Sequence, residues 1–137
     1  MSVSNTTASG SLVDVSKGPL GYVAIVLAIV TGVIHLVLAP RVIGFSRTLA
    51  ILFALNGLGF LGGIALYLTR YWRPELYLVA AAYAVVTVLA FFVWGGFEGF
   101  ASAFYMGGEL NVMAVVAKAA EVLLAVVAGV LYANAEG

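Results

Sequence analysis

Long apolar stretches, separated by short polar ones, make up most of this chain. Four of them lie at residues 20–38, 48–69, 76–94 and 112–132. Each is close to the ~20 residues that a helix needs to cross ~30 Å of hydrocarbon. They are too long for buried strands and lack the alternation of a membrane barrel. The pattern predicts four transmembrane helices, and their short connections predict an up-down-up-down path.

Helix-breaking and polar residues separate these stretches. Pro40 follows the first stretch, and the segment RYWRPE at 70–75 separates the second from the third. Paired glycines at 95–96 and 107–108 flank the connection to the fourth. Glycine and proline are unfavourable inside helices. Residues 19–137 are therefore predicted to form one all-α domain, an integral membrane four-helix bundle.

Two segments lie outside the predicted spans. Residues 1–18 are polar and rich in serine and threonine, so we expect a disordered tail. Between residues 95 and 109, the aromatic residues Phe97, Phe100 and Phe104 recur at helical spacing. We predict a short interfacial helix there, with its aromatic face at the headgroup boundary. A lid over a site between the helices is the alternative.

Composition agrees with a membrane location. Of the 137 residues, 64% are hydrophobic and 9% charged, whereas soluble domains carry about 25% charged residues. Six basic and six acidic residues are scattered singly, so no nucleic-acid-binding patch is expected. The absence of cysteine excludes disulfides and thiolate metal sites. The expected partners are the lipid bilayer, other membrane subunits or a second copy of the chain.

The basic residues next to the predicted spans bear on orientation. Lys17, Arg70 and Arg73 fall on the side of the two termini. Arg41 and Arg47 fall on the other side. Because cytoplasmic loops carry the excess of basic residues, both termini of this multi-pass protein are predicted to lie in the cytoplasm, at the cell membrane.

Polar side chains from all four spans fall in the half of the membrane nearest the first and third loops. They are His35, Asn56, Thr87, Lys118 and Glu121. An isolated charge at this depth costs on the order of 3 kcal/mol, so such groups face protein or water. Lys118 and Glu121 are three residues apart on one helical face and can pair with each other. We interpret them as a structural ion pair, with a proton relay as the alternative.

Small residues on the same faces predict close helix packing. The candidates are Gly32, Gly59, Gly63 and Gly129. His35 and Asn56 are then interpreted as hydrogen-bonded packing residues. One histidine per chain makes neither a usual metal site nor a two-histidine haem site, so no metal or cofactor is expected. No catalytic constellation is apparent either.

The segments GVIHLVLAP (32–40) and FALNGLGFLGGIALYL (53–68) carry a family resemblance. The chain resembles, from about residue 21 to 133, the small four-span membrane proteins of unknown function common in halophilic archaea. The resemblance implies a membrane location and four helices, and it carries no established activity.

Three functions remain open. The first is a non-enzymatic structural or accessory subunit of a membrane complex. The second is a small oligomeric transporter or proton-coupled carrier, in which Glu121, Lys118 and His35 carry the ion. The third is a quinone- or haem-associated redox subunit that uses His35 with Tyr83 or Trp94.

Overall fold

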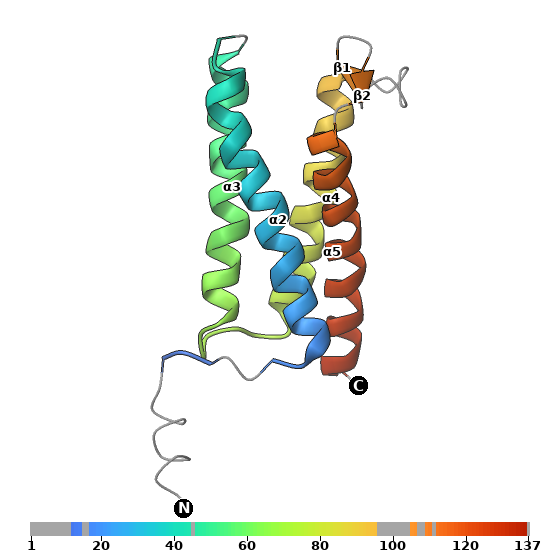
Figure 1. The fold of residues 1–137 in the computed structure, drawn as a ribbon. Coiled ribbons are helices and arrows are strands. Elements are labelled where there is room, and N and C mark those ends of the chain that lie inside the picture. The colour runs from blue at the N-terminus through green and yellow to red at the C-terminus, as the bar shows by residue number, and fades with distance from the viewer. Residues whose placement is uncertain are drawn as a thin grey trace, which may run out of the picture.

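Four long helices form the fold in the computed structural model, which describes residues 12–14, 17–44, 46–95, 105–106, 109–110 and 112–136. Their bounds are Pro19–Val42 (α2), Arg47–Tyr67 (α3), Glu75–Gly95 (α4) and Val112–Glu136 (α5). The start of α2, the α3–α4 connection and the end of α5 lie at one end of the bundle, and the α2–α3 connection lies at the other (Figure 1). Apart from one short pair of strands, the all-α prediction is confirmed for the described residues, and successive helices run in opposite directions.

Local sequence signals explain the helix starts. Pro19 opens α2, because its fixed φ suits a first helical turn. Ser46 caps α3, since its Oγ accepts a hydrogen bond of 3.1 Å from the backbone N–H of Leu49. At its other end α2 continues through Pro40 to Val42, four residues past the predicted end at residue 38.

The connection between α4 and α5 differs from the prediction where it is described. Tyr105–Met106 (β1) and Glu109–Leu110 (β2) pair as antiparallel strands. This end of the predicted interfacial helix is therefore a hairpin. Two glycines between two short segments are a sequence signal for a hairpin turn. The three phenylalanines on which the helix was predicted lie outside the described residues.

Part of the N-terminal tail is bonded to the α3–α4 connection. The N–H of Arg70 donates to the carbonyl of Leu12 (2.8 Å), and the N–H of Asp14 donates to the carbonyl of Leu68 (2.7 Å). Residues 12–14 are thus held in place within the tail predicted to be disordered, and residues 1–11 lie outside the described residues.

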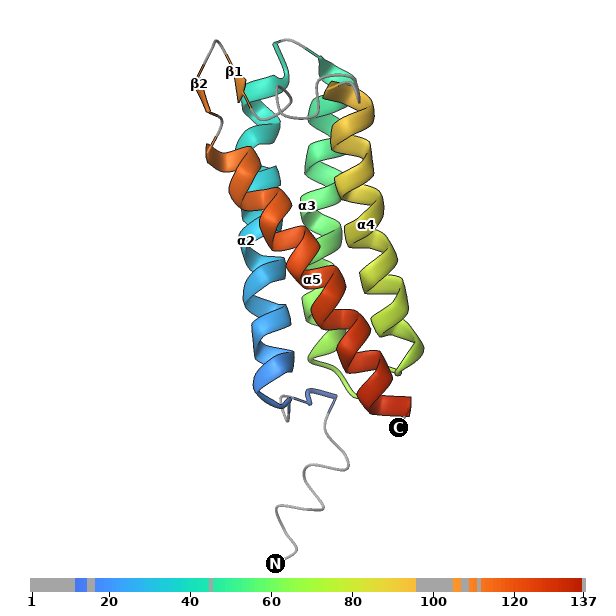
Figure 2. The same cartoon turned by 90° about the vertical axis from the view of Figure 1, so that its right-hand side faces the viewer.

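The helices are arranged as two antiparallel pairs. α2 packs along α3, and α4 packs along α5. α5 crosses α2 and joins the two pairs (Figures 1 and 2). One buried residue from each helix contributes to the apolar core. These residues are Ala28, Phe60, Ala84 and Leu124.

The outer surface of the bundle is strongly apolar. Large side chains on every helix are more than half exposed, among them Val26, Leu55, Val86 and Val126. Within the described residues, α2, α3 and the segment Val112–Ala135 of α5 are long and apolar enough to cross a membrane. The apolar part of α4 found there, Glu75–Phe91, is shorter.

Candidate functional site: a buried polar cluster between α2 and α5

Glu121 of α5 is the centre of a buried polar cluster. Its side chain is 0% exposed. The Nζ of Lys118, one turn earlier, lies 2.6 Å from one carboxylate oxygen, and the hydroxyl of Thr31 on α2 donates to the other. Burial of a carboxylate is costly unless it is paired and hydrogen-bonded. Lys118 and Thr31 supply these contacts from two different helices.

His35 of α2 completes the cluster. Its Nδ1 lies 2.8 Å from the backbone carbonyl oxygen of Thr31 and 3.9 Å from the nearer carboxylate oxygen of Glu121. Because a carbonyl oxygen only accepts, Nδ1 carries the hydrogen. In the neutral ring Nε2 is therefore an acceptor, and no hydrogen-bond partner for it is found among the described residues.

Aromatic rings of α3 and α4 enclose the cluster. The ring of His35 meets Phe53 edge-on at 5.3 Å and lies 6.3 Å from Phe60, measured between centroids. The Nζ of Lys118 lies 5.0 Å from the centroid of Phe91, within range of a cation–π interaction. Side chains from all four helices thus surround Glu121, and the four members of the cluster are each at most 7% exposed.

Asn56 and Thr87, also predicted for this cluster, form a separate polar pair between α3 and α4. The Oγ1 of Thr87 donates to the Oδ1 of Asn56 at 3.1 Å. The hydroxyl of Tyr83 donates to the backbone carbonyl of Asn56 at 3.0 Å. Among the described residues no hydrogen bond joins this pair to Glu121. The structure therefore divides the five predicted polar residues into two groups.

All the residues of this site lie in the part of the chain that matches one known sequence family. The family model matches residues 6–132. The chain belongs to a family of unknown function, DUF7475. No curated protein and no solved structure matches the chain. The family carries no activity over to this chain, so function has to be inferred from the geometry of these side chains.

Thr31 was not among the predicted site residues, and Tyr83 was predicted only as a redox partner of His35, not as a contact of Asn56. Thr31 precedes His35 by four residues, and Tyr83 precedes Thr87 by four. Residues at this spacing share a helical face. A search for hydroxyl groups one turn from each predicted polar residue would have found both.

The four glycines predicted to pack between helices have different surroundings. Gly32 lies at the crossing of α2 and α3, where a Cβ on Gly57 would come 2.7 Å from the carbonyl oxygen of Gly32. A Cβ on Gly59 would collide with the hydroxyl of Tyr83. A Cβ on Gly63 or Gly129 would meet nothing within 4 Å among the described residues. Two of the four candidates therefore face open space within the chain.

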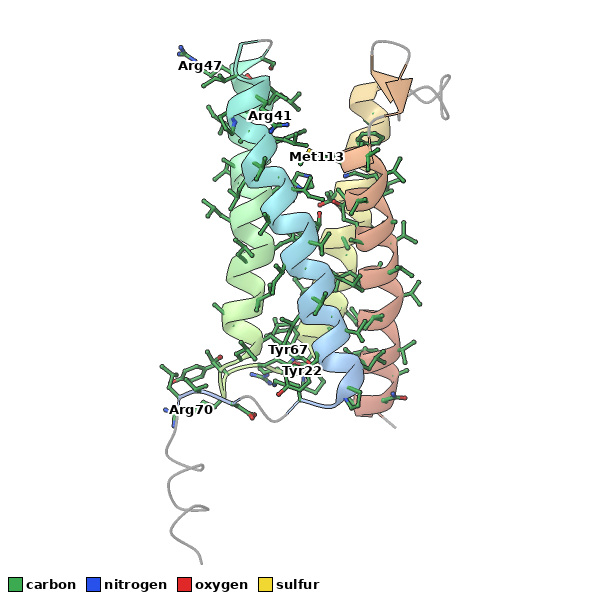
Figure 3. All side chains as sticks on the ribbon, in the orientation of Figure 1. Tyr22, Arg41, Arg47, Tyr67, Arg70 and Met113 are labelled. Carbon is green, nitrogen blue, oxygen red and sulfur yellow. The ribbon has the colours of Figure 1, made fainter. Side chains whose placement is uncertain are left out.

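Figure 3 labels residues at the two ends of the bundle. Arg41 and Met113 face each other at the end where α2 finishes and α5 begins, with the guanidinium 4.0 Å from the sulfur. Tyr22, Tyr67 and Arg70 lie at the opposite end. The polar cluster occupies the half of the bundle near Arg41, as its sequence positions predicted.

Proposed function

We propose that this chain is an integral membrane protein whose four helices all cross the bilayer. A contiguous apolar exterior of this extent favours association in water. In hydrocarbon the same side chains are solvated, while polar groups must be satisfied inside the protein. The exposed Val26, Leu55 and Val86 and the enclosed Glu121 follow this distribution. α4 has 21 residues, about 31 Å of helix, which is sufficient for a fourth span.

The proposed role is that of a non-enzymatic structural or accessory subunit in a membrane complex, with both termini in the cytoplasm. The observation that carries this proposal is the contact set of Glu121. The carboxylate contacts Lys118 of its own helix and Thr31 of α2, and rings of α3 and α4 pack against His35 and Lys118. A charged group satisfied in this way holds the two helix pairs in one register, because separating them would leave it unpaired.

Membrane insertion is tested by cysteine accessibility, since the chain has no natural cysteine. We expect Ser4→Cys and Asn134→Cys to react with an impermeant thiol reagent from one side, and Ser46→Cys from the other. Labelling of Ser4→Cys and Asn134→Cys from opposite sides would rule out the four-span topology.

The subunit role is tested by purification from native membranes, with an absorption spectrum of the product. We expect stoichiometric co-purification of another membrane protein and no visible absorption band. A chain that purifies alone would contradict the subunit role, and a bound pigment would favour a redox role instead.

A second candidate function is a proton-coupled carrier. It is favoured by the proximity of three titratable side chains, Glu121, Lys118 and His35. Flux in proteoliposomes separates the two functions. Loss of a proton-driven flux in Glu121→Gln, with folding preserved, supports the carrier. Absence of any flux from the wild-type protein supports the structural role.

A further inference from the structure

An apolar groove of about 180 Å³ lies in the half of the bundle opposite the polar cluster. Its lining comes from all four helices and includes Gly63 of α3, Ala80 of α4, Ala28 of α2 and Leu124 of α5. Gly63 was predicted to allow close packing of helices, but in the structure it lines an open space. The groove ends at the α3–α4 connection, where Trp72 contributes to its lining.

Three aromatic residues form the end of the groove. The ring of Tyr67 lies 4.8 Å from Trp72 and 5.7 Å from Tyr77, between centroids, and the two tyrosine hydroxyls are 3.1 Å apart. The Nε1 of Trp72 is buried and has no hydrogen-bond partner among the described residues. Tyrosine and tryptophan at the end of a membrane helix mark the level of the lipid headgroups. This end of the groove therefore combines an apolar body with hydrogen-bonding groups.

Lys17 adds positive charge to the same end. Its Nζ lies 4.3 Å from the centroid of the Tyr67 ring. Among the described residues, no acidic side chain lies within ion-pair distance of Lys17 or of Arg70, whereas Arg73 is paired with Glu75 at 3.3 Å. The cation–π contact does not neutralise the charge of Lys17, and among the described residues no ion pair with it is found. An anionic group beside Tyr67 would be electrostatically complementary.

We propose that the groove binds one hydrocarbon chain of an anionic phospholipid, with the phosphate beside Lys17. The inference rests on the membrane location proposed above, because a groove that opens sideways in a bilayer faces lipid. The apolar lining of the groove suits a hydrocarbon chain. The phosphate and ester oxygens of the lipid are hydrogen-bond acceptors, and the Nε1 of Trp72 has no acceptor among the described residues. The positive charge of Lys17 favours an anionic headgroup over a zwitterionic one.

Fluorescence quenching in vesicles tests the proposal. The chain has two tryptophans, so Trp94→Phe leaves Trp72 as the sole emitter. The full chain is reconstituted in phosphatidylcholine that contains either chain-brominated phosphatidylglycerol or chain-brominated phosphatidylcholine. We expect Trp72 to show a preference of about fivefold for the anionic lipid, the factor expected of one basic side chain at a membrane surface. Lys17→Gln should abolish the preference and Arg70→Gln should leave most of it; an equal loss in both would overturn the assignment to Lys17.

Gly63 and Gly62 offer a matched pair for the groove itself. A Cβ on either meets nothing within 4 Å, and only Gly63 lines the groove. Gly63→Leu should fill the groove and remove the anionic preference, whereas Gly62→Leu should retain it. Equal quenching in both variants would overturn the groove as the binding site. A changed oligomeric state in Gly63→Leu, with the lipid preference intact, would assign the groove to a second copy of the chain and also overturn the proposal.

The failure of this inference is distinguishable from failure of the membrane location. If brominated chains of neither lipid quench Trp72, nor Trp94 in a Trp72→Phe variant, the chain is not in the bilayer and both proposals fail. If both lipids quench both tryptophans equally, the chain is in the bilayer and the lipid site alone is refuted.

Discussion

The two halves of the bundle fill the space between the helix pairs in different ways. Near the α2–α3 connection, Thr31, Lys118 and Glu121 meet between α2 and α5, and each of these residues is at most 7% exposed. Near the α3–α4 connection, the small residues Gly63 and Ala80 line an apolar groove. In the first, closed half, paired polar side chains fill the space between the helix pairs. In the second, open half, small apolar residues leave part of that space empty. Small residues allow helices to approach closely, but they do not by themselves require it.

The largest expected effect comes from breaking the ion pair in the closed half. Lys118→Met leaves the Glu121 carboxylate without its cation in a buried site, and we expect a loss of about 3–5 kcal/mol in unfolding free energy. The double variant Lys118→Met/Glu121→Leu replaces both charges by apolar groups and should be nearly as stable as the wild type. Denaturant unfolding in detergent measures both. A single variant as stable as the wild type would show that water reaches the cluster and would favour the carrier.

Thr31→Val is expected to have the next largest effect. It preserves the shape of the side chain and removes the hydrogen bond to the Glu121 carboxylate, at a cost of about 2 kcal/mol. Thr87→Val is the matched control, because the acceptors within reach of its hydroxyl, the Asn56 amide oxygen and the Tyr83 carbonyl oxygen, are both neutral, and we expect a loss of about 1 kcal/mol. The same unfolding assay compares them. Equal losses would mean that the charge on Glu121 does not strengthen its hydrogen bond.

In the open half, the position of a glycine should decide the outcome. Gly59→Leu forces the Tyr83 hydroxyl from its hydrogen bond with Asn56 and should cost about 1–3 kcal/mol. Leu58→Ala, at a residue that is 56% exposed, should change stability by less than about 0.5 kcal/mol. Thermal unfolding in detergent ranks the two variants. If Leu58→Ala lost more stability than Gly59→Leu, the close helix contact of α3 would be made by the face that carries Leu58.

The smallest effect on stability is expected for Gly63→Leu. Its Cβ has open space, so we expect a change within about 0.5 kcal/mol, although the same variant should alter lipid preference. Comparison with Gly59→Leu by thermal unfolding in the same detergent isolates the effect of the groove. A loss as large as that of Gly59→Leu would mean that α3 and α4 close on each other in the bilayer and that the groove is absent there.

Much of the fold follows from the sequence without tertiary information. The length of the apolar stretches determined the four helices, and the interval of three residues determined that Lys118 and Glu121 share a face. Depth along each helix also placed His35 in the same half as this pair. These properties belong to single helices, whose rise and period are fixed by backbone geometry.

Only the tertiary structure decided which faces meet. It selected Thr31 as the partner of Glu121, paired Asn56 with Thr87 instead of with the charged cluster, and left Gly63 and Gly129 uncovered. The rotation and crossing of each helix depend on how all the side chains of its neighbours interlock. Helical periodicity therefore determines which residues share a helical face. Packing among the four helices determines which residues of the neighbouring helices that face contacts.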